Sequence, residues 1–213
     1  MKNNYFSLLL IVMAYATLPF VGYAQIKKEN LKIGFITGTG TQNSFPFNLE
    51  SYTHEITFYK ARVNYTFKEK RKWAFEINLE PGFNIAEHQL LNKYFIKPTD
   101  SDNFREEREI FLQKRTINEY VLDIGFLVRY SVYKNVSAFA IGGVGPMIGD
   151  KETARLAKGF AFSDIFGMGI SYEINKIQLD FRYSVRHTSN LEFKKPNNGH
   201  NTTNIELGIL FQL

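Results

Sequence analysis

The chain has 213 residues, no cysteine, and 26 lysines and arginines against 21 aspartates and glutamates, for a formal net charge of +5. This length suits one domain, and the lack of cysteine excludes a disulfide framework. The basic residues are scattered, so the sequence shows no nucleic-acid footprint, whereas a mild positive balance suits a surface of anionic lipid head groups.

A targeting segment is predicted at the N-terminus. Lys2 precedes an apolar run over residues 6–21, and Gly22-Tyr23-Ala24 has the small-x-small pattern of a cleavage site. The alternative is a membrane anchor, but the apolar core of the run is short for a full span. We predict a signal peptide over residues 1–24 that is removed on export, followed by a single domain over residues 25–213.

The mature chain alternates apolar and polar residues with a period of two, which is typical of β-strands with two different faces. The clearest example is the stretch from Trp73 to Glu80. Asp164 departs from the alternation of its segment. Eight segments are predicted as strands, over about residues 31–39, 55–67, 73–80, 119–131, 136–147, 160–172, 177–187 and 205–213.

The two faces of these segments decide the fold class. One face carries bulky aromatic and aliphatic residues, and the other carries glycines and charges. A barrel of eight strands encloses just enough room for side chains, so paired charges and small residues fit its interior better than a ring of aromatics. The sequence therefore predicts an all-β, eight-stranded antiparallel transmembrane β-barrel of the outer-membrane type. The alternative is a soluble lipid-binding barrel of the lipocalin type, in which the aromatics would point inward.

The connections between the segments support this class. Short connections are expected at residues 68–72, 132–135 and 173–176, and they alternate with long ones at 40–54, 84–117, 148–158 and 188–202. Outer-membrane barrels have short periplasmic turns and longer outside loops. Within the longest connection, the charged stretch from Asn92 to Arg115 is interpreted as a mobile surface loop. In the alternative interpretation, Ile110 and Phe111 extend strands above the membrane.

A candidate catalytic pair follows the seventh segment. Apolar residues occupy its odd positions, and both His187 and Ser189 are odd, so the imidazole and the hydroxyl are expected side by side on the lipid-facing wall near the outer rim. An i, i+2 pair on a strand has Cβ atoms roughly 7 Å apart. A serine activated by a neighbouring imidazole performs nucleophilic acyl transfer. A His-x-Ser sequence also arises commonly by chance. The outer leaflet at this depth contains lipid A of lipopolysaccharide, whose acyl chains are ester-linked.

The residues around this pair resemble a known family. His187-Thr188-Ser189-Asn190, then Lys195-Pro196-Asn197-Asn198-Gly199 and a final strand, are similar to the lipid A 3-O-deacylases of the PagL type, also called acyloxyacyl hydrolases. The resemblance implies an outer-membrane barrel of a Gram-negative bacterium that removes the acyl chain at the 3 position of lipid A. It further implies Ser189 as nucleophile, His187 as base and Asn190 as a contributor to the oxyanion hole, without a cofactor.

The acidic member of the family's Ser-His-Glu triad is where the sequence departs from this resemblance. The position two residues after the Pro-Asn-x-Gly segment carries Glu in the family and is Asn201 here. Asn201 occupies an odd position, as the lipid-facing residues of the last segment do, so its side chain is expected on the lipid face. An asparagine can orient an imidazole through its side-chain oxygen. Glu192 is the alternative orienter, although it is expected in a loop. Glu206 occupies an even position, so its side chain is expected to point into the lumen.

The remaining histidines and the charge pattern bear on metals, partners and alternative functions. His54, His88 and His200 stand apart in the sequence, so each is interpreted as a loop residue and no metal site is predicted. The expected partners are lipid A and the outer-membrane lipids, and the sequence leaves open whether two copies form a homodimer. The alternative function is a non-catalytic outer-membrane barrel, a structural or adhesion scaffold with a silent motif.

Overall fold

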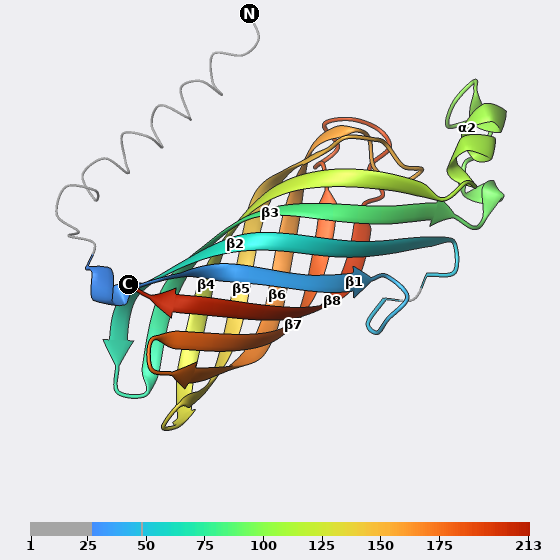
Figure 1. The fold of residues 1–213 in the computed structure, drawn as a ribbon. Helices are drawn as coiled ribbons and strands as arrows, with labels where there is room; N and C mark the ends of the chain where they lie inside the picture. Colours follow the sequence, from blue (N-terminus) through green and yellow to red (C-terminus); the bar gives the residue numbers. More distant parts are fainter. Residues whose placement is uncertain (1–26, 48) are drawn as a thin grey trace, which may run out of the picture.

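Eight antiparallel strands form a closed barrel (Figure 1), in which β1 also pairs with β8. The computed structural model describes residues 27–47 and 49–213, so the predicted signal peptide lies outside the described residues. Because the barrel is closed, each strand is hydrogen-bonded to a neighbour on both sides. The hydrocarbon core of a membrane requires this, since it offers no hydrogen-bond partners to an open strand edge. The predicted eight-stranded barrel is confirmed. Its strands are β1 (Leu31–Thr41), β2 (Tyr52–Lys70), β3 (Trp73–Leu90), β4 (Arg115–Tyr133), β5 (Val136–Gly149), β6 (Gly159–Ile174), β7 (Ile177–Ser189) and β8 (His200–Gln212).

Several strands are longer than their sequence pattern indicates. β2 has 19 residues and β3 has 18, whereas about 9–11 residues suffice for a tilted strand to cross a bilayer. The additional residues lie mainly at the outer end, where outward positions such as Glu55, Glu87 and Thr203 are polar. Because the outward face is polar there while inward positions such as Ile56 and Ala86 are apolar, the alternation that marks a lipid-facing wall stops before the backbone pairing does.

Short and long connections separate to opposite ends of the barrel (Figure 1). The short turns lie at the end that also carries the C-terminus and the 3₁₀-helix η1 (Lys28–Asn30). At the other end, the connection between β3 and β4 contains a second 3₁₀-helix, η2 (Lys93–Phe95), and the α-helix α2 (Phe104–Phe111). Among the described residues, no helix is long and apolar enough to cross a membrane.

Helix α2 corrects both interpretations of the long connection. Ile110 and Phe111 lie in the helix and extend no strand. Phe111 is buried against Leu90, Ile96 and Ala154, with Phe104 packed beside them. Phe104 and Phe111 are seven residues apart, so two helical turns place both on one face. Five of the eight helix residues are charged, which is why the segment resembled a surface loop.

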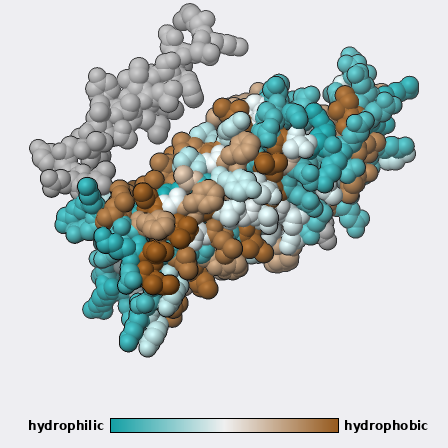
Figure 2. Space-filling model, in the orientation of Figure 1, coloured by the Kyte–Doolittle hydropathy of each residue, from teal (hydrophilic) through white to brown (hydrophobic). Residues whose placement is uncertain are grey.

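The two faces of the barrel wall have opposite chemistry. Figure 2 shows apolar side chains gathered around the middle of the molecule and polar side chains towards both ends. Outward residues of β6 such as Phe166, Met168 and Ile170 are exposed, whereas Arg62 and Arg182 on the inner face are buried. The prediction of charges inside and aromatics outside is confirmed, and the soluble-barrel alternative is wrong.

The inward charges form a network of ion pairs across the lumen. Arg182 donates to both carboxylate oxygens of Glu80 at 2.9 Å and also pairs with Glu206, which has the predicted inward parity. Arg62 bonds to Asp180 at 2.8 Å, and Lys60 bonds to Asp123 at 3.0 Å. Buried charges are tolerated only when they are paired in this way. The network therefore fills the lumen and fixes the strand parity that exposes the opposite wall.

Candidate active site

Strand β7 places the two predicted catalytic side chains on the outer wall. Arg186 and Thr188 are buried on the inner side, whereas His187 is exposed and Ser189 is half-buried on the outer side. Arg186 is held inward by an ion pair to Glu119 at 2.9 Å. Since side chains alternate along a strand, this inward anchor directs His187 outward.

His187 is oriented by a neighbour on β8. The backbone register pairs His187 with Asn201, and His187 Nδ1 lies 2.7 Å from Asn201 Oδ1. An amide oxygen only accepts hydrogen bonds, so Nδ1 carries the hydrogen and donates it. The lone pair of the neutral ring is then on Nε2, the nitrogen that can accept a proton from a nucleophile.

Ser189 is the last residue of β7 and lies on the same face as His187, two positions further along. Its cross-strand partner is Phe162 on β6. In the part of the chain that the structure describes, no hydrogen bond joins the Ser189 hydroxyl to the imidazole. Catalytic hydrogen bonds are often long before substrate binds, so this spacing is compatible with a pair that closes over an ester.

A carboxylate that sequence reasoning left unexplained lies on the other side of His187. Asp164 of β6 is directly opposite His187 in the register, and its side chain is exposed on the outer wall. Directly opposed residues on antiparallel strands have Cβ atoms about 4.5–5.5 Å apart. His187 therefore lies between an amide on β8 and a carboxylate on β6. The sequence did contain a sign of this: Asp164 is a charged residue at a position where the alternation predicts an apolar one.

Asn190 and Glu192 lie differently from the predicted arrangement. Asn190 is buried, its side-chain nitrogen donates to Lys194 O at 2.7 Å, and its backbone N–H donates to Asn197 Oδ1 at 2.8 Å. In this structure the Asn190 amide braces the loop after β7, and its oxyanion role stays a prediction. Glu192 is exposed in that loop, and Asn201 occupies the position beside Nδ1 that Glu192 would have needed.

Two outer loops hold each other above the site. Residues 150–158 follow β5 and residues 190–199 follow β7, and the two loops are joined by a bridge between Leu156 and Asn197. Arg155 Nε donates to Gly199 O at 2.8 Å, and Asn198 N donates to Arg155 O at 2.7 Å. Burial lowers the pKa of the Arg155 guanidinium, which nonetheless stays charged in proteins. The loop after Ser189 is therefore fixed at both ends.

Gly199 shows why the loop needs a glycine directly before β8. Its φ is +65°, in the left-handed region that glycine adopts without cost. A Cβ atom here would lie 2.6 Å from Thr188 O and 3.1 Å from His187 Cε1. The backbone thus passes close beside the imidazole ring, and a larger residue would displace it.

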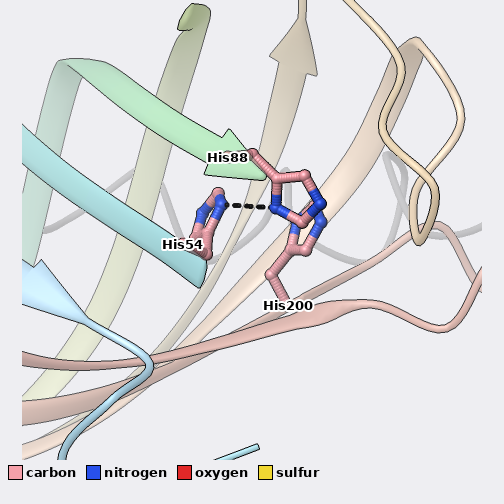
Figure 3. Close-up of side chains that lie close together, drawn as sticks. All are labelled: His54, His88 and His200. Atoms are coloured by element: carbon pink, nitrogen blue, oxygen red, sulfur yellow. Dashed lines mark hydrogen bonds between the residues drawn. The ribbon is translucent and has the colours of Figure 1, made fainter. Parts of the chain in front are cut away.

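The remaining three histidines converge inside the barrel, although they were predicted to be isolated loop residues. Figure 3 shows His54, His88 and His200 facing one another from β2, β3 and β8. Their exposed fractions are 1%, 2% and 3%, and the Nδ1 atoms of His54 and His88 are 3.3 Å apart. The prediction was wrong because strand register, which pairs His54 with His88, is not visible from sequence spacing.

The barrel, its polar lumen and its apolar outer wall define an outer-membrane β-barrel protein. The family model "Lipid A 3-O-deacylase (PagL)" matches residues 49–209, which is more than half of the chain, so the chain belongs to this family. Its function is that of a lipid A 3-O-deacylase of the outer membrane, a hydrolase that acts on an ester.

Several solved structures are similar to this chain. Neisserial surface protein A matches with a TM-score of 0.51 and 8% identity, over 86% of this chain and 97% of its own. The outer-membrane enzyme PagL matches with a TM-score of 0.46 and 12% identity, over 85% of this chain and 99% of its own. OprG from Pseudomonas aeruginosa matches with a TM-score of 0.40 and 10% identity, over 85% of this chain and 91% of its own. A comparison with curated proteins finds no match.

Proposed function

We propose that Ser189 and His187 on the outer wall perform the deacylation of lipid A by acyl transfer. His187 Nε2 takes the Ser189 proton as the hydroxyl oxygen bonds to the ester carbonyl carbon. The tetrahedral intermediate collapses by breaking the bond to the sugar oxygen, which receives that proton from His187. Water, deprotonated by His187, then cleaves the acyl-serine and releases the fatty acid.

The observation that carries this proposal is the 2.7 Å contact between His187 Nδ1 and Asn201 Oδ1 on the outward face. It fixes the tautomer whose free Nε2 can serve as the base. An asparagine supplies no negative charge, so it orients the ring without stabilising the imidazolium. Asp164, opposite His187 on β6, supplies that charge in the proposed site.

Asn190 has a positioning role in this proposal. Its amide N–H group is bonded to Lys194 O, so it shapes the turn that begins directly after Ser189. In the same way, Asn197 braces the turn by accepting from Asn190 N. The turn holds the nucleophile at the end of its strand, where an ester in the outer leaflet can reach it.

A groove on the outer wall beside the site fits an acyl chain. It has a volume of about 570 Å³ and crosses β7, β8, β1, β2 and β3, with Thr39, Ile85, Tyr183 and Ile205 among its lining residues and Glu55 and Glu87 at its outer end. Thr203 lies on the same face as Asn201 and two positions further along β8. The loop before β2 covers the groove edge, because Tyr183 Oη and Thr203 Oγ1 both donate to Phe45 O at 3.0 Å.

The proposed chemistry is tested by expressing the wild type and Ser189→Ala in cells whose lipid A is otherwise unmodified. Mass spectrometry of lipid A is expected to show loss of the 3-O acyl chain with the wild type and intact lipid A with the variant. Heat-modifiable migration on gels checks that both barrels fold. Equal deacylation by a folded variant would contradict the role of Ser189, and intact lipid A with the folded wild type would favour the silent scaffold.

A further inference from the structure

Three buried histidines at the outer mouth of the lumen are not used by the proposed chemistry. His54, His88 and His200 come from three strands, and their candidate ligand nitrogens all lie within 4.8 Å of one another (Figure 3). Two ring nitrogens of the cluster, His88 Nε2 and His200 Nδ1, are buried and have no hydrogen-bond partner among the described residues. An unpaired buried polar atom is costly, so the cluster has free ligand capacity.

The geometry points to a site for one divalent transition-metal ion of the zinc type, held by the imidazoles of His54, His88 and His200. A tetrahedral zinc ion with Zn–N bonds of about 2.0–2.1 Å keeps its nitrogen ligands about 3.3–3.4 Å apart. His54 Nδ1 and His88 Nδ1 already lie 3.3 Å apart. Neutral imidazole is a preferred ligand for zinc, copper and nickel, whereas calcium and magnesium prefer oxygen.

The third ligand needs only a small movement. The rings of His54 and His200 stack with centroids 4.3 Å apart and an interplanar angle of 11°. Since lone pairs lie in the ring plane, parallel rings cannot both aim at one ion. A turn of the His200 ring directs its nitrogen towards the gap between the other two histidines.

The surroundings of His200 accommodate the tautomer that a metal site needs. His200 Nε2 lies 3.0 Å from Thr153 Oγ1, which also accepts from the backbone N–H groups of Arg155 at 3.1 Å and Leu156 at 2.9 Å. In the tautomer with the hydrogen on Nε2, the His200 ring donates to Thr153 Oγ1. Nδ1 of His200 is then left as a ligand, in the manner of hydrogen-bonded histidines at known metal sites.

Charged groups lie around the cluster. Glu119 attracts a positive charge at His54, while Arg155 and Arg186 repel one. Arg186 and Glu119 form an ion pair with each other, and Arg155 lies 4.4 Å above the Tyr52 ring, which packs on His88 and His200. Because Glu119 is already paired with Arg186, a bound cation would be held by the imidazole nitrogens themselves.

A bound ion would connect the outer ends of β2 and β3 to the first residue of β8. That residue, His200, directly precedes Asn201, so the ion would stiffen the strand segment that carries the proposed orienter. The metal would act as a structural clamp inside the lumen, because the strand separates it from the outer wall. The metal site does not rest on the catalytic proposal.

The test is zinc binding by the full mature barrel, refolded in detergent and freed of metal with a chelator. Titration calorimetry is expected to show one Zn²⁺ per chain, with no response to Mg²⁺. Co²⁺ as a probe is expected to give the visible absorption of a four-coordinate site. His54→Phe and His200→Gln should each weaken binding at least 100-fold, whereas His187→Ala, outside the lumen, should bind like the wild type.

Each outcome decides the proposal. The proposal is supported if the two lumen variants lose Zn²⁺ binding and His187→Ala keeps it. Heat-modifiable migration on gels checks that each variant is folded. If a lumen variant fails to fold, the stoichiometry and the Co²⁺ spectrum of the wild type decide. No stoichiometric Zn²⁺ binding by the wild type, or equal binding after both lumen substitutions, would overturn it.

Discussion

The outer ends of β7 and β8 present two histidine environments on opposite faces of the same wall. On the outer face, His187 pairs with Asn201 and is exposed. One position along, Thr188 pairs with His200 on the inner face, where His200 is only 3% exposed and stacks on His54. Two residues that follow each other along one strand therefore face different environments, one the membrane and the other the lumen.

The comparison shows that parity, rather than residue type, assigns the role. His187 has an acceptor on one side, a carboxylate strand neighbour on the other, and the proposed nucleophile two positions away. The lumen histidines have other imidazoles as neighbours and lie within a polar interior. A shift of one residue in the register would exchange the two faces. The predictions below test that separation, from the largest effect to the smallest.

Removing the outer imidazole should have the largest effect. His187→Ala is expected to lower the rate of lipid A deacylation by about 10³–10⁴-fold, because the serine loses its general base. The thermal stability of the barrel should hardly change, since the side chain is exposed. Deacylation is measured on lipid A in detergent. His54→Phe is the matched lumen control and should lose less than about tenfold, and equal losses would contradict the separation of faces.

Breaking the lumen network should affect stability instead. Arg182→Met leaves the buried carboxylates of Glu80 and Glu206 without their shared partner. Removing one member of a buried ion pair costs about 3–5 kcal/mol, so the denaturant midpoint should fall markedly. Urea titration followed by tryptophan fluorescence measures this. The fraction that remains folded should deacylate lipid A at the wild-type rate, and unchanged stability would show that the network is dispensable.

Replacing the orienter should have an intermediate effect on rate. Asn201→Leu removes the acceptor from His187 Nδ1 and is expected to lower the deacylation rate by about 10²-fold, because the ring loses its tautomer and orientation. Asn201→Glu restores the acidic type of the family triad and should match or exceed the wild type. If Asn201→Leu is fully active, Asn201 has no role in the reaction, regardless of the activity of Asn201→Glu.

Neutralising the carboxylate on β6 should have the smallest of the four effects. Asp164→Asn is expected to lower the rate about tenfold, which corresponds to about 1.4 kcal/mol of lost imidazolium stabilisation. The loss should shrink when Asn201→Glu supplies a charge from the other side, so a double-mutant cycle should show coupling. Additive effects would mean that Asp164 acts independently of His187.

The fold was predictable because the same alternation extends through the middle of every strand. The apolar face, the charged face and the alternating loop lengths agreed on a barrel, and the parity of His187, Ser189 and Asn201 followed from them. The outer strand ends were not predictable, since outward residues such as Glu87 are polar there while inward residues such as Ala86 are apolar.

The site was predictable in part. Sequence reasoning placed His187 and Ser189 on the same face of β7 and Asn201 beside His187 on the last strand. The neighbours across β6 depend on register, so Asp164 looked like an irregularity, and the buried histidines on β2, β3 and β8 looked unrelated. The contact of the Asn190 side chain with Lys194 O was not predictable, because it depends on the turn after β7.

The central claim is that His187 activates Ser189 on the outer wall, and covalent labelling tests it most directly. The folded barrel is treated with a fluorophosphonate that carries a long alkyl chain, and peptide mass spectrometry locates the adduct. The account predicts an adduct on Ser189 in the wild type and none on Ser189 in His187→Ala. An unlabelled Ser189 in the wild type, or equal labelling of Ser189 in both proteins, would contradict it.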